Sequence, residues 1–258
     1  MQINRKEFLK KAGIAGASLI AGGVLYSLFK GDDIITAVVE SSAQTKWAML
    51  IDVKKCAGKP DCSACMTACH KGHNVPAIDD IRREIKWIWK ADFGNVFPEH
   101  TSEYMDVAVR SQKVIVACNQ CDNPPCVRVC PVGATWKRAD GIVMMDHHRC
   151  IGCRYCMAAC PYGSRSFNWK DPRKILSGND IRVEYPVRTK GVVEKCNFCA
   201  ERIDVGEMPL CVEACSEGAI LFGNVADPES DIRRALAGKY VLRRKAELGT
   251  NPEIYYLV

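Results

Sequence analysis

Beyond its N-terminal segment, the chain is a series of short apolar runs bounded by polar and turn residues. Runs at 47–53, 114–116, 141–146 and 219–222 are too short for ordinary helices and have the length of buried strands. Each run lies directly before or after a group of cysteines. The pattern therefore predicts a repeated order of strand, cysteine loop, short helix and strand.

The N-terminal segment has a different pattern. Residues 1–11 carry four basic side chains against one acidic side chain, and an uncharged apolar run over 12–29 follows. A basic start before an apolar stretch is typical of an export signal, and the run is also near the minimum length for a membrane span. Residues 4–10 resemble a twin-arginine export motif in which Lys6 replaces the second arginine. We expect an apolar helix within 1–43 that is an export signal, either cleaved or retained as an anchor; the alternative is a plain membrane-anchor helix.

Composition narrows the class of protein. The 258 residues are 48% hydrophobic and 26% charged, which excludes a disordered tail, a collagen-like fibre and a polytopic membrane protein. The 16 cysteines are about three times the usual share. The chain is too long for a small disulfide scaffold, since such scaffolds need bridges only because they lack a core. The formal charge of +6 is weak evidence for an anionic partner.

The cysteines fall into four quartets with none left over. The quartets are Cys56, Cys62, Cys65 and Cys69; Cys118, Cys121, Cys126 and Cys130; Cys150, Cys153, Cys156 and Cys160; and Cys196, Cys199, Cys211 and Cys215. Their spacings are C-x5-C-x2-C-x3-C, C-x2-C-x4-C-x3-C, C-x2-C-x2-C-x3-C and C-x2-C-x11-C-x3-C. Proline follows the second and third quartets directly, at Pro131 and Pro161.

The third quartet is the bacterial-ferredoxin signature for a [4Fe–4S] cluster. In this signature three cysteines wrap one cluster and the fourth ligates a partner cluster. We expect the fourth cysteine of each quartet to start a helix and to point away from its own loop. Four quartets then predict four [4Fe–4S] clusters bound by all sixteen cysteines.

Other uses of cysteine fit the spacing less well. Zinc ribbons use paired C-x2-C knuckles and need neither a third cysteine at regular spacing nor a following proline. Cysteines two residues apart make poor disulfides with one another. A c-type haem needs C-x-x-C-H, and the nearest stretch, Cys65 to His70, is one residue too long.

The predicted fold is α+β, a double bacterial-ferredoxin fold with two pseudo-symmetric two-cluster modules and inserted loops. The cluster domain spans 44–258. One module is 118–160, the other combines 46–70 with 190–222, and the insertions are 71–113 and 161–189.

All four quartets, including the x4 gap of the second and the x11 gap of the fourth, resemble those of a known family. It comprises the four-cluster iron–sulfur subunits of membrane-bound respiratory oxidoreductases, which serve dimethyl sulfoxide, polysulfide, tetrathionate, nitrite and formate systems. The resemblance covers about 46–258 and includes the C-terminal stretches 247–252 and 255–257. The first quartet departs from the family, which usually has C-x2-C where this chain has C-x5-C. The spacer segments 83–89 and 97–100 resemble those of DsrO-type subunits of sulfate and sulfite respirers.

The resemblance implies how the cysteines are shared among clusters. Each set takes three cysteines from one quartet and one from another: Cys56, Cys62 and Cys65 with Cys215; Cys196, Cys199 and Cys211 with Cys69; Cys118, Cys121 and Cys126 with Cys160; and Cys150, Cys153 and Cys156 with Cys130.

A few other residues carry expectations of their own. Trp87 and Trp89 would share one face of a strand, and packing in the core is favoured over a partner-docking patch. The pair His147-His148 is expected at the surface or at a strand end rather than in a proton relay. The basic cluster 243–245 is predicted to be a solvated face. No nucleic-acid recognition motif is present.

The resulting hypothesis is an electron-transfer subunit with no catalytic residues and no substrate site of its own. The resemblance implies a quinone-interacting integral membrane subunit and a second redox partner, such as a multihaem cytochrome c. It also implies a link to sulfite or sulfate respiration at the periplasmic face of the cytoplasmic membrane. The alternatives are a subunit of a molybdopterin oxidoreductase and, from another class, a zinc-stabilised interaction protein.

Bound clusters would also change the net charge. Because each cluster with its thiolates carries about −2, four clusters would turn the formal charge of +6 into about −2.

Overall fold

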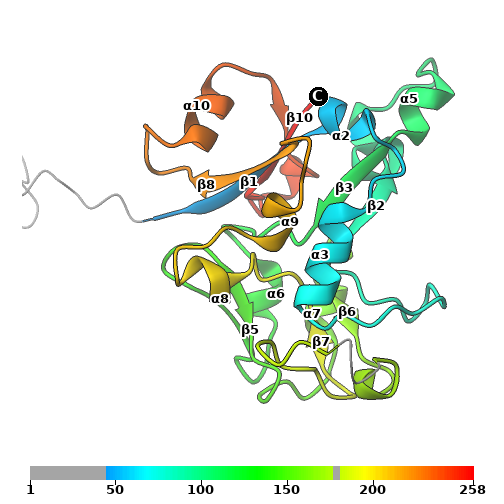
Figure 1. Cartoon of the computed structure of the whole chain (residues 1–258), viewed down its shortest axis with the longest axis vertical. Coiled ribbons are helices and arrows are strands. Elements are labelled where there is room, and N and C mark those ends of the chain that lie inside the picture. The colour runs from blue at the N-terminus through cyan, green and yellow to red at the C-terminus, as the bar shows by residue number, and fades with distance from the viewer. Residues whose placement is uncertain (1–44, 177–180) are drawn as a thin grey trace, which may run out of the picture. The chain divides into compact units, whose positions relative to one another are not determined.

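The computed structural model describes residues 45–176 and 181–258 (Figure 1). The predicted export signal or anchor over 1–43, with its apolar helix, lies outside the described residues. The described chain is a mixture of short strands and short helices, in agreement with the predicted α+β class. None of the helices within 45–176 and 181–258 is both long and apolar enough to cross a bilayer.

A four-stranded sheet brings the first and last strands of the described chain together (Figure 1). Its strands, in spatial order, are β8 (Ile220–Asn224), β1 (Trp47–Asp52), β10 (Ile254–Leu257) and β9 (Val241–Leu242). β1 is parallel to β10, with Ile51 beside Tyr256, and antiparallel to β8, with Ile51 opposite Ile220. The predicted strands 47–53 and 219–222 are therefore neighbours in one sheet.

β1 is apolar without alternation because both of its faces are covered. Met49 and Ile51 belong to the main core, while Ala48 and Leu50 pack in a second cluster with Ile232. Ile232 lies on α10 (Asp231–Ala237), whose N-terminus is capped by the Ser230 hydroxyl. Helix α10 thus closes the outer face of the sheet (Figure 1).

Three two-stranded antiparallel ribbons complete the β-structure. They pair β2 (Ile88–Asp92) with β3 (Lys113–Ala117), β4 (Thr135–Lys137) with β5 (Val143–Met145), and β6 (Ser166–Phe167) with β7 (Val193–Glu194). The predicted strands at 114–116 and 141–146 correspond to β3 and β5. Figure 1 shows the β2–β3 ribbon beside α3, and β5, β6 and β7 at the far end from the four-stranded sheet.

Short helices connect these strands. Those beside the cysteines are α2 (Val53–Ala57), α3 (Ala64–Gly72), α6 (Pro125–Arg128), α7 (Tyr155–Ala158), α8 (Ala200–Ile203) and α9 (Leu210–Glu213). The others are α4 (Phe93–Val96), α5 (Val107–Ser111) and the 3-10 turns η2 (Pro98–His100), η3 (Pro172–Lys174) and η5 (Ala246–Leu248). Most are a single turn, and a proline or glycine follows most of them within a few residues.

The expectation that the fourth cysteine of a quartet starts a helix is wrong. In the last three quartets the third cysteine lies inside the helix, as Cys126 does in α6, and the fourth follows its end, as Cys130 does. In the first quartet Cys65 and Cys69 both lie inside α3. The x3 gap spans one helical turn, so the helix forms between the two cysteines. Where Pro131 follows, it disfavours helical backbone at Cys130 and ends the helix there.

A tight turn recurs after three of the helices. Gly133, Gly163 and Gly218 each come three residues after a fourth cysteine and have φ of +62°, +63° and +56°. Each donates its N–H to the carbonyl of that cysteine, at 3.4, 3.4 and 3.1 Å. Glycine suits these left-handed positions because it has no Cβ. The repeated turn is the clearest internal similarity between the cysteine segments.

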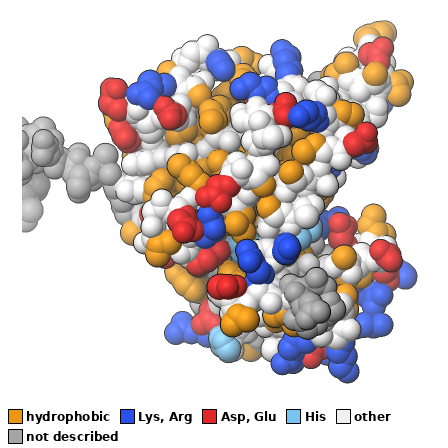
Figure 2. Space-filling view, viewed as in Figure 1, with side chains coloured by type: hydrophobic (Ala, Val, Ile, Leu, Met, Phe, Trp, Pro, Cys, Tyr) orange, Lys and Arg blue, Asp and Glu red, His pale blue; other side chains and the backbone are white. Residues whose placement is uncertain are grey.

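The structure corrects the expectation for the basic cluster 243–245. Arg244 is buried, with its guanidinium over the ring of Tyr162, and Arg243 bonds to the Tyr255 hydroxyl. Both arginines pack on aromatic rings and are not a solvated face. Basic side chains instead gather along the lower edge of the face in Figure 2, in the part of the molecule where Figure 1 places β6 and β7.

The tryptophan pair lies in the core, as expected. Trp87 is fully buried and directly precedes β2, while Trp89 is half-buried and packs against the same core. His148 is exposed, and His147 lies in the turn before the third quartet with a half-buried ring. Burial lowers the pKa of His147 to about 4, which keeps the ring neutral.

Candidate metal centres

The structure brings the sixteen cysteines together in four sets, and three of these sets line cavities. Set A is Cys56, Cys62, Cys65 and Cys215; set C is Cys118, Cys121, Cys126 and Cys160; set D is Cys130, Cys150, Cys153 and Cys156. None of these sixteen cysteines, all within the described residues, forms a disulfide. These groupings coincide with three of the sets that the family resemblance implies.

Set B consists of Cys69, Cys196, Cys199 and Cys211, all of them buried. Burial raises the pKa of the Cys69 thiol well above its usual value, and the nearby sulfurs of Cys196, Cys211 and Cys199 raise it further. These four cysteines are the remaining set implied by the resemblance.

Each set contains at least one thiol whose pKa burial raises. Burial, reinforced by neighbouring sulfurs, raises the pKa of Cys65 to about 11 and that of Cys121 to about 12. Thiolates cannot accumulate so close together unless a cation binds them. Thiolate is a soft ligand that selects iron–sulfur clusters, zinc or copper(I).

The exchange of cysteines between quartets favours a cluster over a single ion. Each of the cavities of sets A, C and D is lined by three cysteines of one quartet and the fourth cysteine of another. Two-cluster ferredoxins share their ligands in this way, whereas zinc ribbons use paired C-x2-C knuckles. The donor set and its exchange between quartets therefore fit [4Fe–4S] clusters.

Two pairs of sets are joined by helices that serve both members of the pair. α3 carries Cys65 of set A and Cys69 of set B one turn apart, and α9 with the residues after it carries Cys211 and Cys215. The two helices pack closely, since a Cβ on Gly72 would lie 2.1 Å from Leu210 Cδ1. Sets A and B are thus adjacent.

Sets C and D are joined in the same way. α6 holds Cys126 of set C and is followed by Cys130 of set D, while α7 holds Cys156 of set D and is followed by Cys160 of set C. α6 and α7 are in contact. The two pairs of sets therefore repeat one arrangement. In each pair, two packed helices carry cysteines of both sets.

Sets B and C meet through Cys196 and Cys118, whose sulfurs influence one another electrostatically. Gln120 ties the two loops together. Its Nε2 donates to the Cys196 carbonyl at 2.8 Å, and its Oε1 accepts from the Val143 N–H at 2.8 Å. The spatial order of the sets is therefore A, B, C, D.

Exposure of the thiols follows this order. Set B in the interior is wholly buried, and two of the four thiols of set C are buried. At the ends, Cys153 of set D is exposed, and three of the four thiols of set A are half-buried. The row of sets thus runs through the protein and reaches its surface at both ends.

The inserted residues of the C-x5-C segment do not prevent set A from forming. Gly58, Lys59 and Pro60 lie at the surface after α2. Lys59 forms an ion pair with Glu217, Nζ to Oε1 2.5 Å, across the mouth of the set A cavity. The insertion bulges outward and leaves Cys56 beside Cys62.

Polar side chains that the spacing of the cysteines does not mark also surround the sets. His73 Nδ1 lies 2.8 Å from the Cys69 carbonyl oxygen and 3.7 Å from Cys69 Sγ, and its Nε2 lies 2.9 Å from Glu201 Oε1. His73, Glu201 and Cys199 could together hold a metal ion. Because Cys199 belongs to set B, this group is part of that site and not a separate one.

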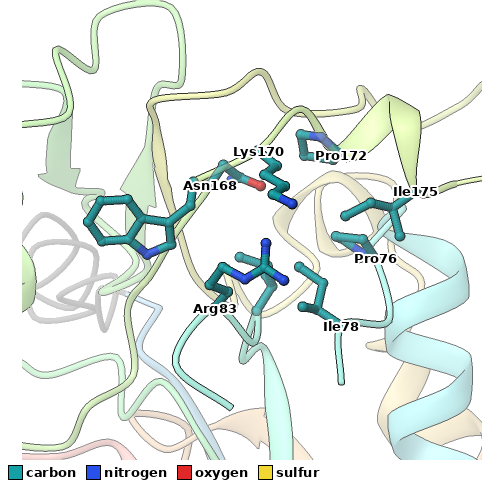
Figure 3. Close-up of a pocket in the computed structure, with 9 residues that line it drawn as sticks. Pro76, Ile78, Arg83, Asn168, Lys170, Pro172 and Ile175 are labelled. Carbon is teal, nitrogen blue, oxygen red and sulfur yellow. The ribbon is translucent and has the colours of Figure 1, made fainter. Parts of the chain in front are cut away.

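A further cavity lies away from the cysteines (Figure 3). Its lining combines apolar residues such as Pro76, Ile78 and Pro172 with the cations Arg83 and Lys170. Figure 3 shows the nitrogens of both cations directed toward the space between these residues. Arg83 is bonded to Asp80, Nε to Oδ2 3.0 Å, and no cysteine or histidine lines this cavity.

Comparison with known proteins identifies the cysteine segments. A family model described as a 4Fe-4S dicluster domain matches residues 111–175 and 170–225, which include the second, third and fourth quartets. The chain is 39% identical over 277 residues to the Hdr-like menaquinol oxidoreductase iron-sulfur subunit 1 of Archaeoglobus fulgidus, covering 98% of this chain and 97% of the relative.

Other relatives belong to several reductases. The menaquinone reductase iron-sulfur cluster-binding subunit of Nitratidesulfovibrio vulgaris is 40% identical, over 82% of this chain and 88% of the relative. A tetrathionate reductase subunit of Salmonella typhimurium is 33% identical, over 100% of this chain and 89% of the relative.

Proposed function

Because the chain belongs to the family of iron–sulfur subunits with 4Fe-4S dicluster domains, we propose that it relays electrons through four clusters, one in each of sets A to D. The protein is an electron-transfer subunit of a reductase complex of the menaquinol or molybdopterin type. The observation that carries the proposal of four clusters is the unbroken order of the sets, A to D, with neighbours joined by shared helices or by Gln120.

The protein's own residues provide the conditions for such a relay. When bound, each cluster supplies a one-electron carrier whose potential depends on hydrogen bonds to sulfur, burial and net charge. Burial of set B keeps water away from the middle of the row. Backbone N–H groups bond to sulfur at Cys196, from Phe198 at 3.4 Å, and at Cys215, from Ala219 at 3.3 Å. Such bonds favour the reduced form, since it carries more negative charge on sulfur.

The proposed partners are a quinone-interacting integral membrane subunit at one end and a redox subunit, such as a multihaem cytochrome c, at the other. Two relatives are named for menaquinol or menaquinone, which supports the first partner. Sets A and D reach the surface, which suits a chain that accepts electrons at one end and passes them on at the other.

We further propose that the protein resembles DsrO-type subunits and acts in sulfite or sulfate respiration, at the periplasmic face of the cytoplasmic membrane. The support for this location is the basic and then apolar pattern of residues 1–30, and the support for this pathway is the spacer at 83–100.

A second candidate is the electron-transfer subunit of a molybdopterin oxidoreductase. Subunits of a tetrathionate reductase and of a selenate reductase are among the relatives, which favours it. Both candidates use the same four sets and differ only in the subunit at one end of the row.

Co-purification separates the two candidates. Membranes from cells that make the tagged full chain would be solubilised gently under anaerobic conditions, and the captured subunits identified by mass spectrometry, with an untagged strain as the control. We expect an integral membrane subunit together with a cytochrome c. A molybdopterin subunit in place of the cytochrome would favour the second candidate, and capture without any membrane subunit would contradict the assignment to a membrane complex.

A further inference from the structure

Arg165 is a buried cation at the junction of sets C and D. It lies just before β6, and only 4% of the residue is exposed. Its Nη2 donates to Cys126 Sγ at 3.0 Å and to Thr135 Oγ1 at 2.9 Å, and its Nη1 lies 3.7 Å from Met145 Sδ. All five N–H donors of a guanidinium need partners when buried, and here a cysteine sulfur is one of them.

Within residues 45–176 and 181–258, no carboxylate forms an ion pair with Arg165. The contrast is Arg188, also buried, whose Nε lies 2.6 Å from Glu194 Oε2. An isolated buried charge is unfavourable by several kcal/mol unless an opposite charge compensates it. The negative charge that compensates Arg165 must therefore come from the cysteine sulfurs beside it.

Both neighbouring sets contribute to the environment of Arg165. Burial by itself would lower the pKa of the Arg165 guanidinium, but the sulfurs of Cys126, Cys156 and Cys118 hold that pKa above its usual value. The geometry agrees: Arg165 lines the cavity of set C, to which Cys126 belongs. Met145, 3.7 Å from Arg165 Nη1, lines the cavity of set D, to which Cys156 belongs. The guanidinium in turn opposes the rise in the pKa of Cys156 that burial causes.

No other cation of the described chain has this relation to the cysteines. Arg165 is the one lysine or arginine in that part of the chain whose hydrogen bond ends on a cysteine sulfur. Lys195 is also buried, but its Nζ donates to backbone carbonyls, including that of Cys196 at 2.8 Å. At set B the charged neighbours are of both signs: the Glu201 carboxylate raises the pKa of Cys199, and the Arg202 guanidinium lowers it.

We propose that Arg165 is a shared counter-ion of sets C and D that raises the reduction potentials of the clusters in both. The inference rests on the proposed function, because it requires a cluster in each set. A cluster and its thiolates gain one negative charge on reduction, and a fixed cation in a poorly solvated site stabilises that charge. Arg165 acts on the clusters through the cysteine sulfurs beside it. Its charge makes the clusters of sets C and D easier to reduce.

The test is a redox titration of the anaerobically purified full chain, with the clusters followed by electron paramagnetic resonance. The variants are Arg165→Met, which removes the charge, and Arg165→Lys, which keeps it. Arg128→Met is the matched control, because Arg128 lies in α6 between Cys126 and Cys130 but is exposed, and solvent screens its charge.

In Arg165→Met we expect two of the four midpoint potentials to fall by about 59 mV or more each. A shift of this size corresponds to at least a tenfold change in the ratio of oxidised to reduced cluster at a fixed potential. The other two should stay in place. Arg165→Lys should recover more than half of the shift, and Arg128→Met should match the wild type. A shift of one potential only, an equal shift of all four, or no shift would overturn the inference.

Iron and sulfide content separate this inference from the proposed function. If the wild type holds no clusters, the proposed function fails; if clusters are present and Arg165→Met leaves their potentials unchanged, only this inference fails. If Arg165→Met does not take up its clusters, the Arg165→Lys variant decides whether a cation is required. A full cluster content with wild-type potentials in Arg165→Lys supports that requirement, and loss of clusters from Arg165→Lys as well would contradict it.

Discussion

Buried charges away from the cysteines stabilise the loops that hold them. Arg188 and Glu194 form an ion pair in which both side chains are 0% exposed. Glu194 also accepts from Trp87 Nε1 at 2.8 Å and from Asn168. Arg188 donates to the Asn74 carbonyl at 2.9 Å and lies over the Trp87 ring. The pair therefore ties the 71–113 and 161–189 insertions to the segment that leads into set B.

Replacing Glu194 with Gln should destabilise the protein strongly. The substitution leaves the Arg188 guanidinium buried without its counter-charge, which is expected to cost about 3–5 kcal/mol. The measurement is the urea midpoint of the cluster-loaded protein. Asp80→Asn, which weakens solvent-accessible ion pairs with Arg82 and Arg83, is the control and should move the midpoint little. Equal effects of the two substitutions would contradict the importance of burial.

Single residues divide clearly into those that the sequence reveals and those that it does not. Cysteine spacing alone marks the candidate ligands, because a cluster loop needs thiols at short regular intervals. Arg165, His73 and Gln120 carry no such signal, since Cys126, Glu201 and Cys196, to which they bond, lie 39, 128 and 76 residues away. The prediction that Arg244 lies in solvent is wrong for the same reason, because nothing local indicates the ring of Tyr162.

At the scale of elements, one helix turn decides which set a cysteine joins. Cys65 and Cys69 lie in the same helix, α3, yet they face sets A and B. Cys215 belongs to set A although it lies far along the chain from Cys65. Membership of a set is thus a property of the packed helices and not of nearness in sequence.

Serine substitutions test this division. Cys65→Ser and Cys215→Ser should weaken or remove the same resonance signal, because both residues face the cavity of set A. Cys69→Ser should affect a different signal, that of set B. The measurement is electron paramagnetic resonance of the reduced protein. Loss of one signal in both Cys65→Ser and Cys69→Ser, with Cys215→Ser affecting another, would contradict the assignment.

The loop of set D depends on a glycine. Gly152 has a φ of +70°, and a Cβ there would lie 2.2 Å from the Gly191 carbonyl oxygen. The backbone of the loop before β7 therefore passes directly against the loop that carries Cys150 and Cys153. Only a residue without a Cβ allows both the conformation and the contact.

Gly152→Ala should therefore reduce iron binding by set D. The matched control is Gly163→Ala, at φ of +63° with open space around the added methyl group, where the conformational cost is only about 1–2 kcal/mol. We expect Gly163→Ala to keep its full iron content and Gly152→Ala to lose up to about four iron atoms per chain. Iron analysis after gel filtration measures this, and equal losses would argue against the contact with Gly191.

A strand or helix can be predicted from this sequence only where the residues of the element itself and its direct neighbours indicate it. The strands β1, β3, β5 and β8 are predictable, since each is an apolar run beside a cysteine group. The pairing of β1 with β10 and the cover that α10 provides depend on contacts between distant segments, and no local pattern indicates them. The prediction for the fourth cysteines is wrong because the helix forms ahead of them, within the x3 gap.

At the scale of the whole molecule, the central feature is a row of four thiol sets that crosses the protein and reaches the surface at both ends. The repeated helix pairs, α3 with α9 and α6 with α7, make this row from two similar halves. The family resemblance implies the membership of the sets, but their spatial order depends on how the loops of Cys118 and Cys196 are joined through Gln120. Distance along the chain does not predict that link.

Iron and acid-labile sulfide, measured per chain on anaerobically purified full-length protein, test the central claim most directly. With four [4Fe–4S] clusters in sets A to D, the protein should contain about sixteen iron and about sixteen sulfide. About eight of each would mean that only two sets are used. Zinc without sulfide would contradict the account altogether.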